Sequence, residues 1–355
     1  MTGLNILPVQ ESNGPEADRF ADAPHPAEML SLVGHQAAEF AFMDAWRSGR
    51  VHHAWLIGGE EGIGKATLAY RIARFVLANP DGKPDATTLD VAASHPVCHQ
   101  IAAHAHPDLA IIRRSLNKEG KALRTEISVD DVRHGLEVFT KTASMGGYRI
   151  CIVDACDELN ASSANALLKT LEEPPVKGLF LLVAHQPNRL LPTIRSRCRV
   201  LPLRALEMDE VAHITSNLPA FADQPFEVHQ RAAELSGGSV RRALSVLDLK
   251  KLAFNDRVQA VFQRFPRIDT TEIDAIAEQT TGRNGDDAFY RFCEICEGWL
   301  SSELIRRPHE PQALAPLSEA WTRLNEAKRE VDIYNLDRRP FVIAMIAELA
   351  ETARS

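Results

Sequence analysis

The stretch that decides the fold is the apolar run Ala54-Trp55-Leu56-Ile57 followed by Gly59-Glu60-Glu61-Gly62-Ile63-Gly64-Lys65. A short apolar strand leading into a glycine-rich loop that opens a helix is the context of a phosphate-binding loop, or P-loop. Glycines let backbone N–H groups approach phosphate oxygens, the helix N-terminus adds positive potential, and Lys65 can reach the outer phosphates. The stretch therefore predicts a nucleotide site that includes Gly59, Gly62, Gly64 and Lys65.

Short apolar runs alternate with helical patterns from this loop to about residue 204. The runs occupy residues 54–57, 109–112, 150–153 and 179–183, and each is long enough for one buried strand. Ser128 and Asp131 form a capping-box pattern, and Ala161 to Glu172 predict a helix that stops before two prolines. Strands separated by helices indicate a parallel sheet covered on both faces. We therefore predict an α/β P-loop domain over residues 23–204.

The pattern changes after Pro202, where the strand-like runs cease. Three short helical patterns, at 208–218, 227–236 and 240–250, predict a small helical lid domain over residues 205–252. Longer amphipathic segments at 286–306, 312–331 and 339–354 predict an all-α domain over residues 253–355. Residues 1–22 lack the features of a signal peptide, so we expect a flexible tail and a cytoplasmic protein.

Composition and charge limit the kind of protein this can be. The 355 residues are 45% hydrophobic and 25% charged, which is typical of a soluble chain of two or three domains without a membrane span. The net charge of −8 argues against strong nucleic-acid binding by this chain alone, because such affinity comes mainly from Lys and Arg. The six cysteines, Cys151 and Cys156 among them, are expected to be reduced and mostly buried.

Two positions beside the loop lack groups that ATP hydrolysis needs. Ala66 stands where Ser or Thr ordinarily ligates Mg²⁺, and Thr67 comes one step too late around the helix. Residues 149–154 have the form of a metal-holding strand that ends in Asp154, yet Ala155 stands where a glutamate would polarise the attacking water. We predict a degenerate site that needs no cofactor, binds ATP or ADP weakly or not at all, and has no ATPase activity.

The stretch between the P-loop and the second strand raises the question of a zinc site. Cys98 is accompanied there by His95, His99, His104 and His106, and both residue types are zinc ligands. A structural zinc site ordinarily takes paired ligands at short spacings with several thiolates, whereas this stretch supplies one thiol. We therefore expect solvated histidines and no bound zinc.

Two further motifs relate the chain to a family. Residues 165–175, Asn-Ala-Leu-Leu-Lys-Thr-Leu-Glu-Glu-Pro-Pro, and residues 190–199, with a Ser196-Arg197-Cys198 core, closely resemble the two signatures of bacterial clamp-loader subunits of the AAA+ class. The resemblance covers about His35 to Leu247. It implies an AAA+ P-loop domain, a three-helix lid and a helical collar through which five subunits assemble into a ring.

Within this family, the resemblance favours a member without hydrolytic activity. The gamma/tau subunits keep both nucleotide-site features, whereas delta-prime-type members keep the Ser-Arg-Cys motif and lose the glutamate that Ala155 replaces here. The retained Lys65 departs from the most degenerate members and leaves nucleotide binding open. The alternative is an active ATPase of the gamma/tau type, against which Ala66 and Ala155 argue.

The resemblance also implies roles for individual residues and for partners. Arg197 would act in trans as an arginine finger at the nucleotide of a neighbouring subunit, with Ser196 and Cys198 as parts of the same motif. Arg241, in a lid motif over residues 238–244, would face a nucleotide phosphate. Outside the family context Arg241 would be interpreted as a solvated charge at a helix start, whereas Arg197 would fit a finger and a surface charge or local ion pair equally well. The implied partners are gamma/tau and delta subunits and, through the complex, the sliding clamp and primed DNA during replication by DNA polymerase III.

Overall fold

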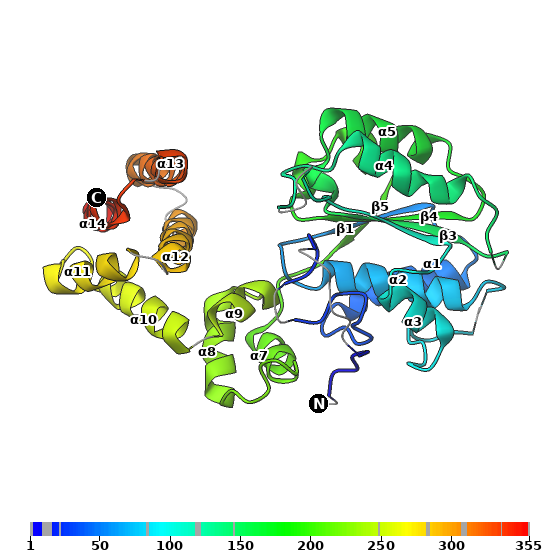
Figure 1. Cartoon of the computed structure of the whole chain (residues 1–355), viewed down its shortest axis with the longest axis horizontal. Helices are drawn as coiled ribbons and strands as arrows, with labels where there is room; N and C mark the ends of the chain where they lie inside the picture. The colour runs from blue at the N-terminus through cyan, green and yellow to red at the C-terminus, as the bar shows by residue number, and fades with distance from the viewer. Residues whose placement is uncertain are drawn as a thin grey trace. The chain divides into compact units, whose positions relative to one another are not determined.

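The computed structural model describes residues 3–8, 16–20, 23–82, 85–117, 122–144, 146–247, 249–281, 285–306, 311–334 and 336–353 (Figure 1). Two compact units make up the chain, Met1–Ser245 and Val246–Ser355. The first unit contains the sheet, the P-loop and residues 205–245 of the region predicted as the lid, whose remaining residues fall in the second unit. The second unit contains the C-terminal helices.

A five-stranded parallel sheet lies at the centre of the first unit, with the strand order β2-β3-β4-β1-β5 (Figure 1). The strands are β1 (Ala54–Gly58), β2 (Leu109–Ile112), β3 (Arg149–Asp154), β4 (Gly178–Ala184) and β5 (Arg199–Pro202). In the register, Leu56 of β1 lies beside Leu182 of β4 and Val200 of β5. The four predicted apolar runs are strands β1 to β4, which confirms the parallel α/β class.

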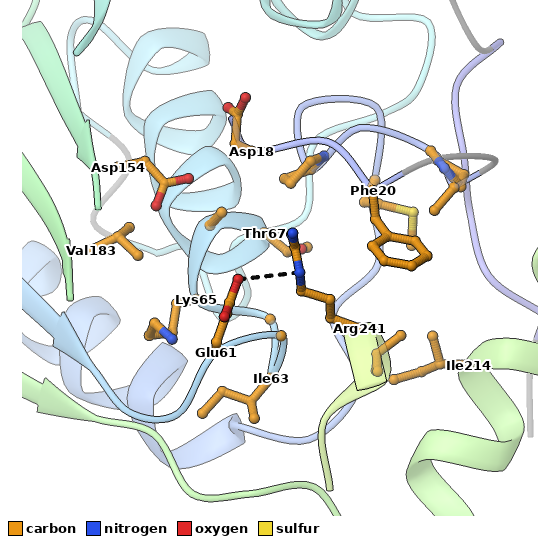
Figure 2. Close-up of a pocket in the computed structure, with 18 of the residues that line it drawn as sticks. Asp18, Phe20, Glu61, Ile63, Lys65, Thr67, Asp154, Val183, Ile214 and Arg241 are labelled. Carbon is orange, nitrogen blue, oxygen red and sulfur yellow. Dashed lines mark ion pairs between the residues drawn. The ribbon is translucent and has the colours of Figure 1, made fainter. Parts of the chain in front are cut away.

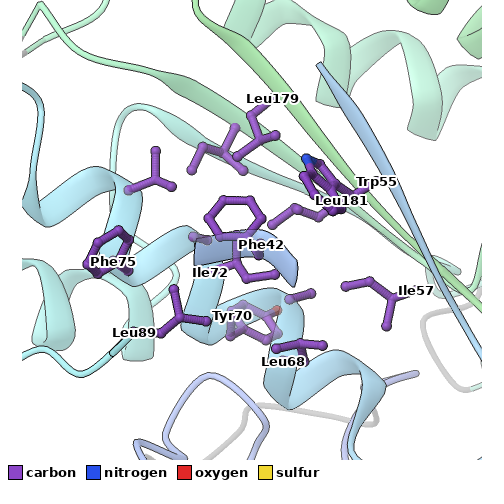
Figure 3. Close-up of a cluster of buried hydrophobic side chains, with 14 of the residues drawn as sticks. Phe42, Trp55, Ile57, Leu68, Tyr70, Ile72, Phe75, Leu89, Leu179 and Leu181 are labelled. Carbon is purple, nitrogen blue, oxygen red and sulfur yellow. The ribbon is translucent and has the colours of Figure 1, made fainter. Parts of the chain in front are cut away.

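One face of the sheet is covered by helices from the N-terminal half of the first unit. Trp55 and Leu181 point to this face and pack with Phe42 of α1 (Gln36–Arg47) and Phe75 of α2 (Lys65–Ala78) (Figure 3). The four side chains are almost completely buried. Because α2 begins where the P-loop ends, this packing fixes the loop at the edge of the sheet.

The opposite face is covered by α4 (Val129–Leu136) and α5 (Ala161–Glu172). Phe180 and Leu182 of β4 point to this side, since successive residues of a strand face opposite ways. Ser128 and Asp131 form the predicted capping box of α4, and α5 has the predicted bounds. Burial on both faces explains why the strands are apolar throughout.

Three short helices follow the sheet within the first unit, as predicted. They are α7 (Met208–Ser216), α8 (Phe226–Ser236) and α9 (Val240–Val246). Gly237 and Gly238 separate α8 from α9 with φ angles of 58° and 84°, which glycine adopts without steric cost. The single helix predicted over 240–250 is wrong at its end, because α9 stops at Val246 and a new helix begins at Leu249.

The second unit packs its helices around an apolar core that includes Phe289, Phe292, Cys293 and Cys296. The helices are α10 (Leu249–Gln263), α11 (Thr270–Gln279), α12 (Gly285–Arg306), α13 (Pro311–Tyr334) and α14 (Arg338–Thr352). The three predicted amphipathic segments correspond to α12, α13 and α14, except that residue 354 lies outside the described residues. None of the helices in the described ranges combines the length and apolar character that crossing a membrane requires.

The N-terminal segment departs from the prediction of a flexible tail. Of residues 1–22 the structure describes 3–8 and 16–20, and both stretches contact the P-loop domain. Ile6 pairs with Met29 in an antiparallel bridge, and the buried Leu7 donates its amide hydrogen to the Glu28 carbonyl over 2.9 Å. These contacts join residues far apart in the sequence, so a search for local periodicity does not find them.

Candidate functional site

A cavity lies at the carboxyl ends of β1 and β3, where the P-loop leads into α2 (Figure 2). This edge of a parallel sheet is the usual place for ligands in α/β proteins. Gly59 lies outside the lining, at the end of β1, and its amide donates to the Ala184 carbonyl over 3.3 Å. The structure brings together the other predicted nucleotide-site residues, which are Gly62, Gly64, Lys65, Thr67, Asp154 and Arg241.

The backbone of the P-loop is arranged to hold an anion. Gly62 and Gly64 have φ angles of 78° and 101°, which side chains other than glycine adopt with strain. A Cβ atom at Gly62 would in addition collide with Ser239 and Arg241 of the lid. Since α2 begins at Lys65, its N-terminal amides and the positive end of its dipole lie at the cavity.

Lys65 and Asp154 are two buried ionisable groups in the lining. Burial lowers the pKa of the Lys65 ammonium to about 8, although the charges of Asp154 and Glu61 oppose this change. Burial raises the pKa of Asp154 to about 7; the charge of Asp18 adds to this rise and Lys65 opposes it. Both pKa values move toward neutrality, so the charge balance of the cavity changes near neutral pH.

The two positions that the sequence marked as deficient also line the cavity. Ala66 and Ala155 present methyl groups there, while Thr67 and Asp154 offer a hydroxyl and a carboxylate. Magnesium prefers six oxygen ligands in octahedral geometry, and α2 and β3 would contribute at most these two side chains to it. A methyl group at position 155 cannot polarise a water molecule. The lining therefore lacks a hydroxyl at position 66 and a carboxylate at position 155.

The acids that follow Ala155 are bound to other groups. Asp157 accepts the backbone N–H groups of His185 and Gln186 over 3.1 and 2.8 Å. Glu158 lines the cavity and pairs with Arg114 at 2.7 Å. Asp157 thus supports the loop after β4, and the charge of Glu158 is balanced by an arginine.

Asp18, a charged residue of the N-terminal segment, also lines this cavity. The Asp18 carboxylate, with 1% of its side chain exposed, accepts a hydrogen bond from His25 Nε2 over 3.0 Å and pairs with Arg113. His25 Nδ1 accepts the Ala27 amide, so Nε2 carries the donated proton. Burial alone would raise the pKa of Asp18, but the hydrogen bond from His25 and the Arg113 guanidinium lower it below its usual value. Arg113 also pairs with Glu16 at 2.8 Å.

Some of these residues could have been found from the sequence and others could not. Arg113 and Arg114 directly follow β2, and the carboxyl ends of parallel strands lie at one edge of a sheet. That rule alone places them at the same edge of the sheet as the P-loop. Asp18 and Phe20 follow no strand and belong to no motif, so only the tertiary structure reveals them as lining residues.

The lid helix α9 contacts the P-loop directly. Ser239 Oγ donates to the Glu61 carbonyl over 2.8 Å, and the Val240 amide donates to the Gly62 carbonyl over 2.9 Å. The Arg241 guanidinium pairs with the Glu61 carboxylate at 3.2 Å and lies 5.4 Å from the centre of the Phe20 ring (Figure 2). Arg241 therefore lies at the cavity, as predicted, and its ion-pair partner is a residue of the P-loop.

The Ser196-Arg197-Cys198 motif lies outside the cavity, between the short helix α6 (Pro192–Arg195) and β5. Ser196 Oγ donates to the Thr193 carbonyl over 3.1 Å, and Cys198 Sγ donates to the Ile194 carbonyl over 3.2 Å. Burial raises the pKa of Cys198 to about 12, which makes it an inert packing residue. The two flanking side chains therefore hold the motif against α6.

Arg197 is held at the surface by two contacts. Its Nη1 donates to the Thr193 carbonyl over 3.0 Å, and its Nη2 pairs with Glu172 at 2.8 Å. Glu172 ends α5 and belongs to the other signature motif. The Arg197 side chain remains 35% exposed, so contacts within its own domain orient it while part of it reaches solvent.

Within the described residues, Cys98 and the histidines considered for zinc do not come close enough together to share a metal. In the described ranges, the acids, histidines and cysteines close enough to share a metal are Glu16, His25 and His104. Arg113 pairs with Glu16 in this group and already supplies positive charge there. Burial raises the pKa of Cys98, whose Sγ donates to a backbone carbonyl. That the chain binds no zinc stays a prediction.

Comparisons with known proteins relate the P-loop domain to replication proteins. Residues 34–207 match the model of the family described as "DNA polymerase III, delta subunit". The DNA polymerase III subunit delta′ of Pseudomonas aeruginosa is 36% identical over 191 residues, which are 53% of this chain and 53% of that protein. The subunit delta′ of Escherichia coli K12 is 35% identical over 158 residues, which are 44% of this chain and 43% of that protein.

Similarity extends to another subunit of the same polymerase. The subunit tau of Escherichia coli K12 is 31% identical over 268 residues, which are 74% of this chain and 39% of that protein. The chain thus spans about half the length, or less, of these curated relatives. A solved structure of a gamma subunit-related protein from Thermotoga maritima aligns with a TM-score of 0.40 and 17% identity, covering 88% of this chain and 99% of that one.

Proposed function

This chain belongs, through residues 34–207, to the AAA+ clamp-loader family of bacterial DNA polymerase III, and we propose that it acts there as a delta-prime-type subunit. In this role it helps to open the sliding clamp and load it onto primed DNA, with gamma/tau and delta subunits as partners. It contributes an arginine to the ATPase site of a neighbouring subunit. It hydrolyses no ATP in its own site.

One observation carries this proposal. The nucleotide cavity has alanines at positions 66 and 155, and an accessible arginine lies elsewhere on the same domain. Ala66 and Ala155 remove a metal ligand and a water-polarising carboxylate from the cavity. Arg197 lies outside that cavity, is oriented by Glu172 and retains 35% exposure. A chain that lacks groups for ATP hydrolysis but presents an oriented guanidinium is suited to act on the nucleotide of a neighbouring subunit.

The charge that develops during phosphoryl transfer explains how this arginine could accelerate hydrolysis in a neighbouring subunit. A guanidinium at the γ-phosphate neutralises charge that develops in the transition state, and supplying one in trans accelerates hydrolysis by roughly 10³ to 10⁵ in well-studied systems. The gain belongs to the neighbour's site. A subunit can therefore keep Arg197 after its own site has lost activity.

A second candidate function is an active ATPase of the gamma/tau type. Two observations favour it, namely the alignment with the subunit tau over 74% of this chain and the retention of Lys65 in the cavity. A steady-state assay of the purified chain separates the two functions. We expect no more than trace hydrolysis, whereas a turnover of about 1 per second or more would establish the second candidate.

The decisive experiment for the first candidate is Arg197→Ala in a reconstituted clamp-loader complex. We expect assembly to remain intact and DNA- and clamp-stimulated ATP hydrolysis to fall at least about tenfold, because the finger contributes only at the transition state. Arg195→Ala is the matched control, since Arg195 lies two residues away and its Nη1 donates to Asn188 Oδ1 over 3.1 Å. Unchanged hydrolysis in a fully assembled Arg197→Ala complex would rule out the proposed role of this arginine.

A further inference from the structure

The positive side chains of the nucleotide cavity are bound to oxygen atoms of the chain itself. Lys65, Arg114 and Arg241 are the lysine and arginine residues in the described lining. Their partners are the Glu60 carbonyl for Lys65, the Glu158 carboxylate at 2.7 Å for Arg114, and the Glu61 carboxylate at 3.2 Å for Arg241. A polyphosphate that entered the cavity would compete with an internal oxygen atom at each of these groups.

Glu61 has a special position among these partners. It lies within the P-loop, between Gly59 and Gly62, and its side chain lines the cavity (Figure 2). The amides of such a loop, the α2 N-terminus and a guanidinium across the cavity are the groups that bind phosphate. A guanidinium binds carboxylate and phosphate through the same charge-assisted hydrogen bonds. The Glu61 carboxylate is therefore bound to the Arg241 guanidinium, a group that a phosphate would otherwise bind.

The same pair belongs to a set of contacts between the lid and the P-loop. Ser239 and Val240, at the start of α9, donate hydrogen bonds to the carbonyls of Glu61 and Gly62. Arg242, the next residue after Arg241, pairs with Glu60 at 3.4 Å. Both ion pairs are about half-exposed, so they contribute little to the stability of the fold. Their effect is on the cavity, because they determine whether Arg241 and Arg242 bind a carboxylate of the P-loop or another anion.

We propose that Glu61 is a built-in substitute for a nucleotide phosphate, which binds Arg241 and holds the lid on the P-loop when no nucleotide is present. This inference rests on the proposed function, since it explains how an idle site keeps its lid in place. It adds a second cause of weak nucleotide binding besides the missing metal ligands. A nucleotide must displace a carboxylate from Arg241, and the Glu61 charge repels its phosphates.

The first test is equilibrium binding of a fluorescent ADP analogue to the full chain without magnesium. Glu61→Gln keeps the size of the side chain and removes its charge, and we expect about tenfold tighter binding, the order of one charge-assisted contact. Glu234→Gln is the matched control, because Glu234 is a half-exposed lid glutamate that pairs with Arg231 at 2.8 Å away from the cavity lining. Binding by Glu61→Gln that is no tighter than that of the unchanged chain would overturn the inference.

The second test measures the lid directly by amide hydrogen exchange without nucleotide. The Val240 amide, which donates to the Gly62 carbonyl, should be protected in the unchanged chain and less protected in the double variant Glu60→Gln, Glu61→Gln. Adding ADP should restore protection in the double variant. A Val240 amide that is unprotected in the unchanged chain and becomes protected only with ADP would overturn the inference. Neither test involves Arg197, so failure here is distinguishable from failure of the proposed function.

Discussion

Arg241 and Arg197 each pair with a glutamate of their own chain, but the two pairs lie in different regions. Arg241 meets Glu61 at 3.2 Å in the nucleotide cavity, and Arg197 meets Glu172 at 2.8 Å outside it. In the cavity the glutamate comes from the loop that would bind phosphate. Outside the cavity the glutamate comes from α5, behind the Ser-Arg-Cys motif. The glutamate therefore engages an arginine that could bind phosphate in the first region. In the second region it orients an arginine that stays accessible.

The charges behind these two arginines also differ in burial. The cavity is backed by the network of Asp18, His25 and Arg113, in which both Asp18 and His25 have 1% of their side chains exposed. The pair of Arg197 and Glu172 is 35% and 45% exposed. Breaking a buried pair leaves an unsatisfied charge in a poorly solvated place, whereas water replaces a lost partner at the surface. The two regions should therefore respond differently to the same substitution.

The largest expected effect on stability is that of Arg113→Ala. It leaves the buried Asp18 carboxylate without its guanidinium partner, and we expect the first unit to lose about 3 kcal/mol of unfolding free energy. Arg197→Ala makes the same chemical change at the exposed pair and should cost less than about 1 kcal/mol. Hydrogen exchange of the β3 and β4 amides measures both losses in the intact chain. Equal losses would contradict the distinction between a buried cavity network and a surface pair.

A smaller effect is expected from Asp154→Asn, through pH. The pKa of Asp154 is raised from 3.8 to about 7, so between these values the folded chain keeps a proton that the unfolded chain releases. Stability due to this group therefore decreases as pH rises from about 4 to about 7. In Asp154→Asn, the loss of unfolding free energy over this pH range should be smaller by on the order of 2 kcal/mol. Urea unfolding at pH 5 and pH 7.5 tests it, and equal pH dependence in both proteins would show that Asp154 is not the group responsible.

That pH window separates Asp154 from Asp18 and Lys65. The charge of Asp18 raises the pKa of Asp154, and Lys65 and Arg113 oppose the rise, with Glu158 as a further acid nearby. Asp18 has a lowered pKa and loses its contribution only at more acidic pH. The pKa of Lys65 is about 8, so the stability that depends on it changes mainly above that pH.

The smallest effect is expected from restoring the two missing catalytic groups together. Ala66→Thr, Ala155→Glu replaces the hydroxyl and the carboxylate, but Glu61 still pairs with Arg241 and a new acid joins Asp18, Asp154 and Glu158. We expect turnover of the isolated chain to stay well below 1 per second. Steady-state phosphate release measures this. Recovery of ordinary ATPase activity would mean that the cavity differs from an active site only at positions 66 and 155.

The sequence by itself determined the class of the fold and much of the cavity. Apolar runs between helical patterns predicted β1 to β4, because strands buried on both faces need apolar residues throughout. The P-loop and the strand ending at Asp154 predicted that Lys65 and Asp154 lie together, since parallel strands share one carboxyl edge. Ala66 and Ala155 were visible as deficient positions for the same reason. Fixed spacings along the chain carry all of this information.

Only the tertiary structure decided how the cavity charges are partnered. Asp18 comes from a segment expected to be a flexible tail, and Arg113 meets it from 95 residues away. Glu61 and Arg241 are 180 positions apart, and either alone is an ordinary surface charge in the sequence. Such pairs depend on how the lid and the N-terminal segment fold back on the sheet. Local periodicity and motif spacing describe neighbours along the chain, whereas electrostatic partnership depends on distance in space.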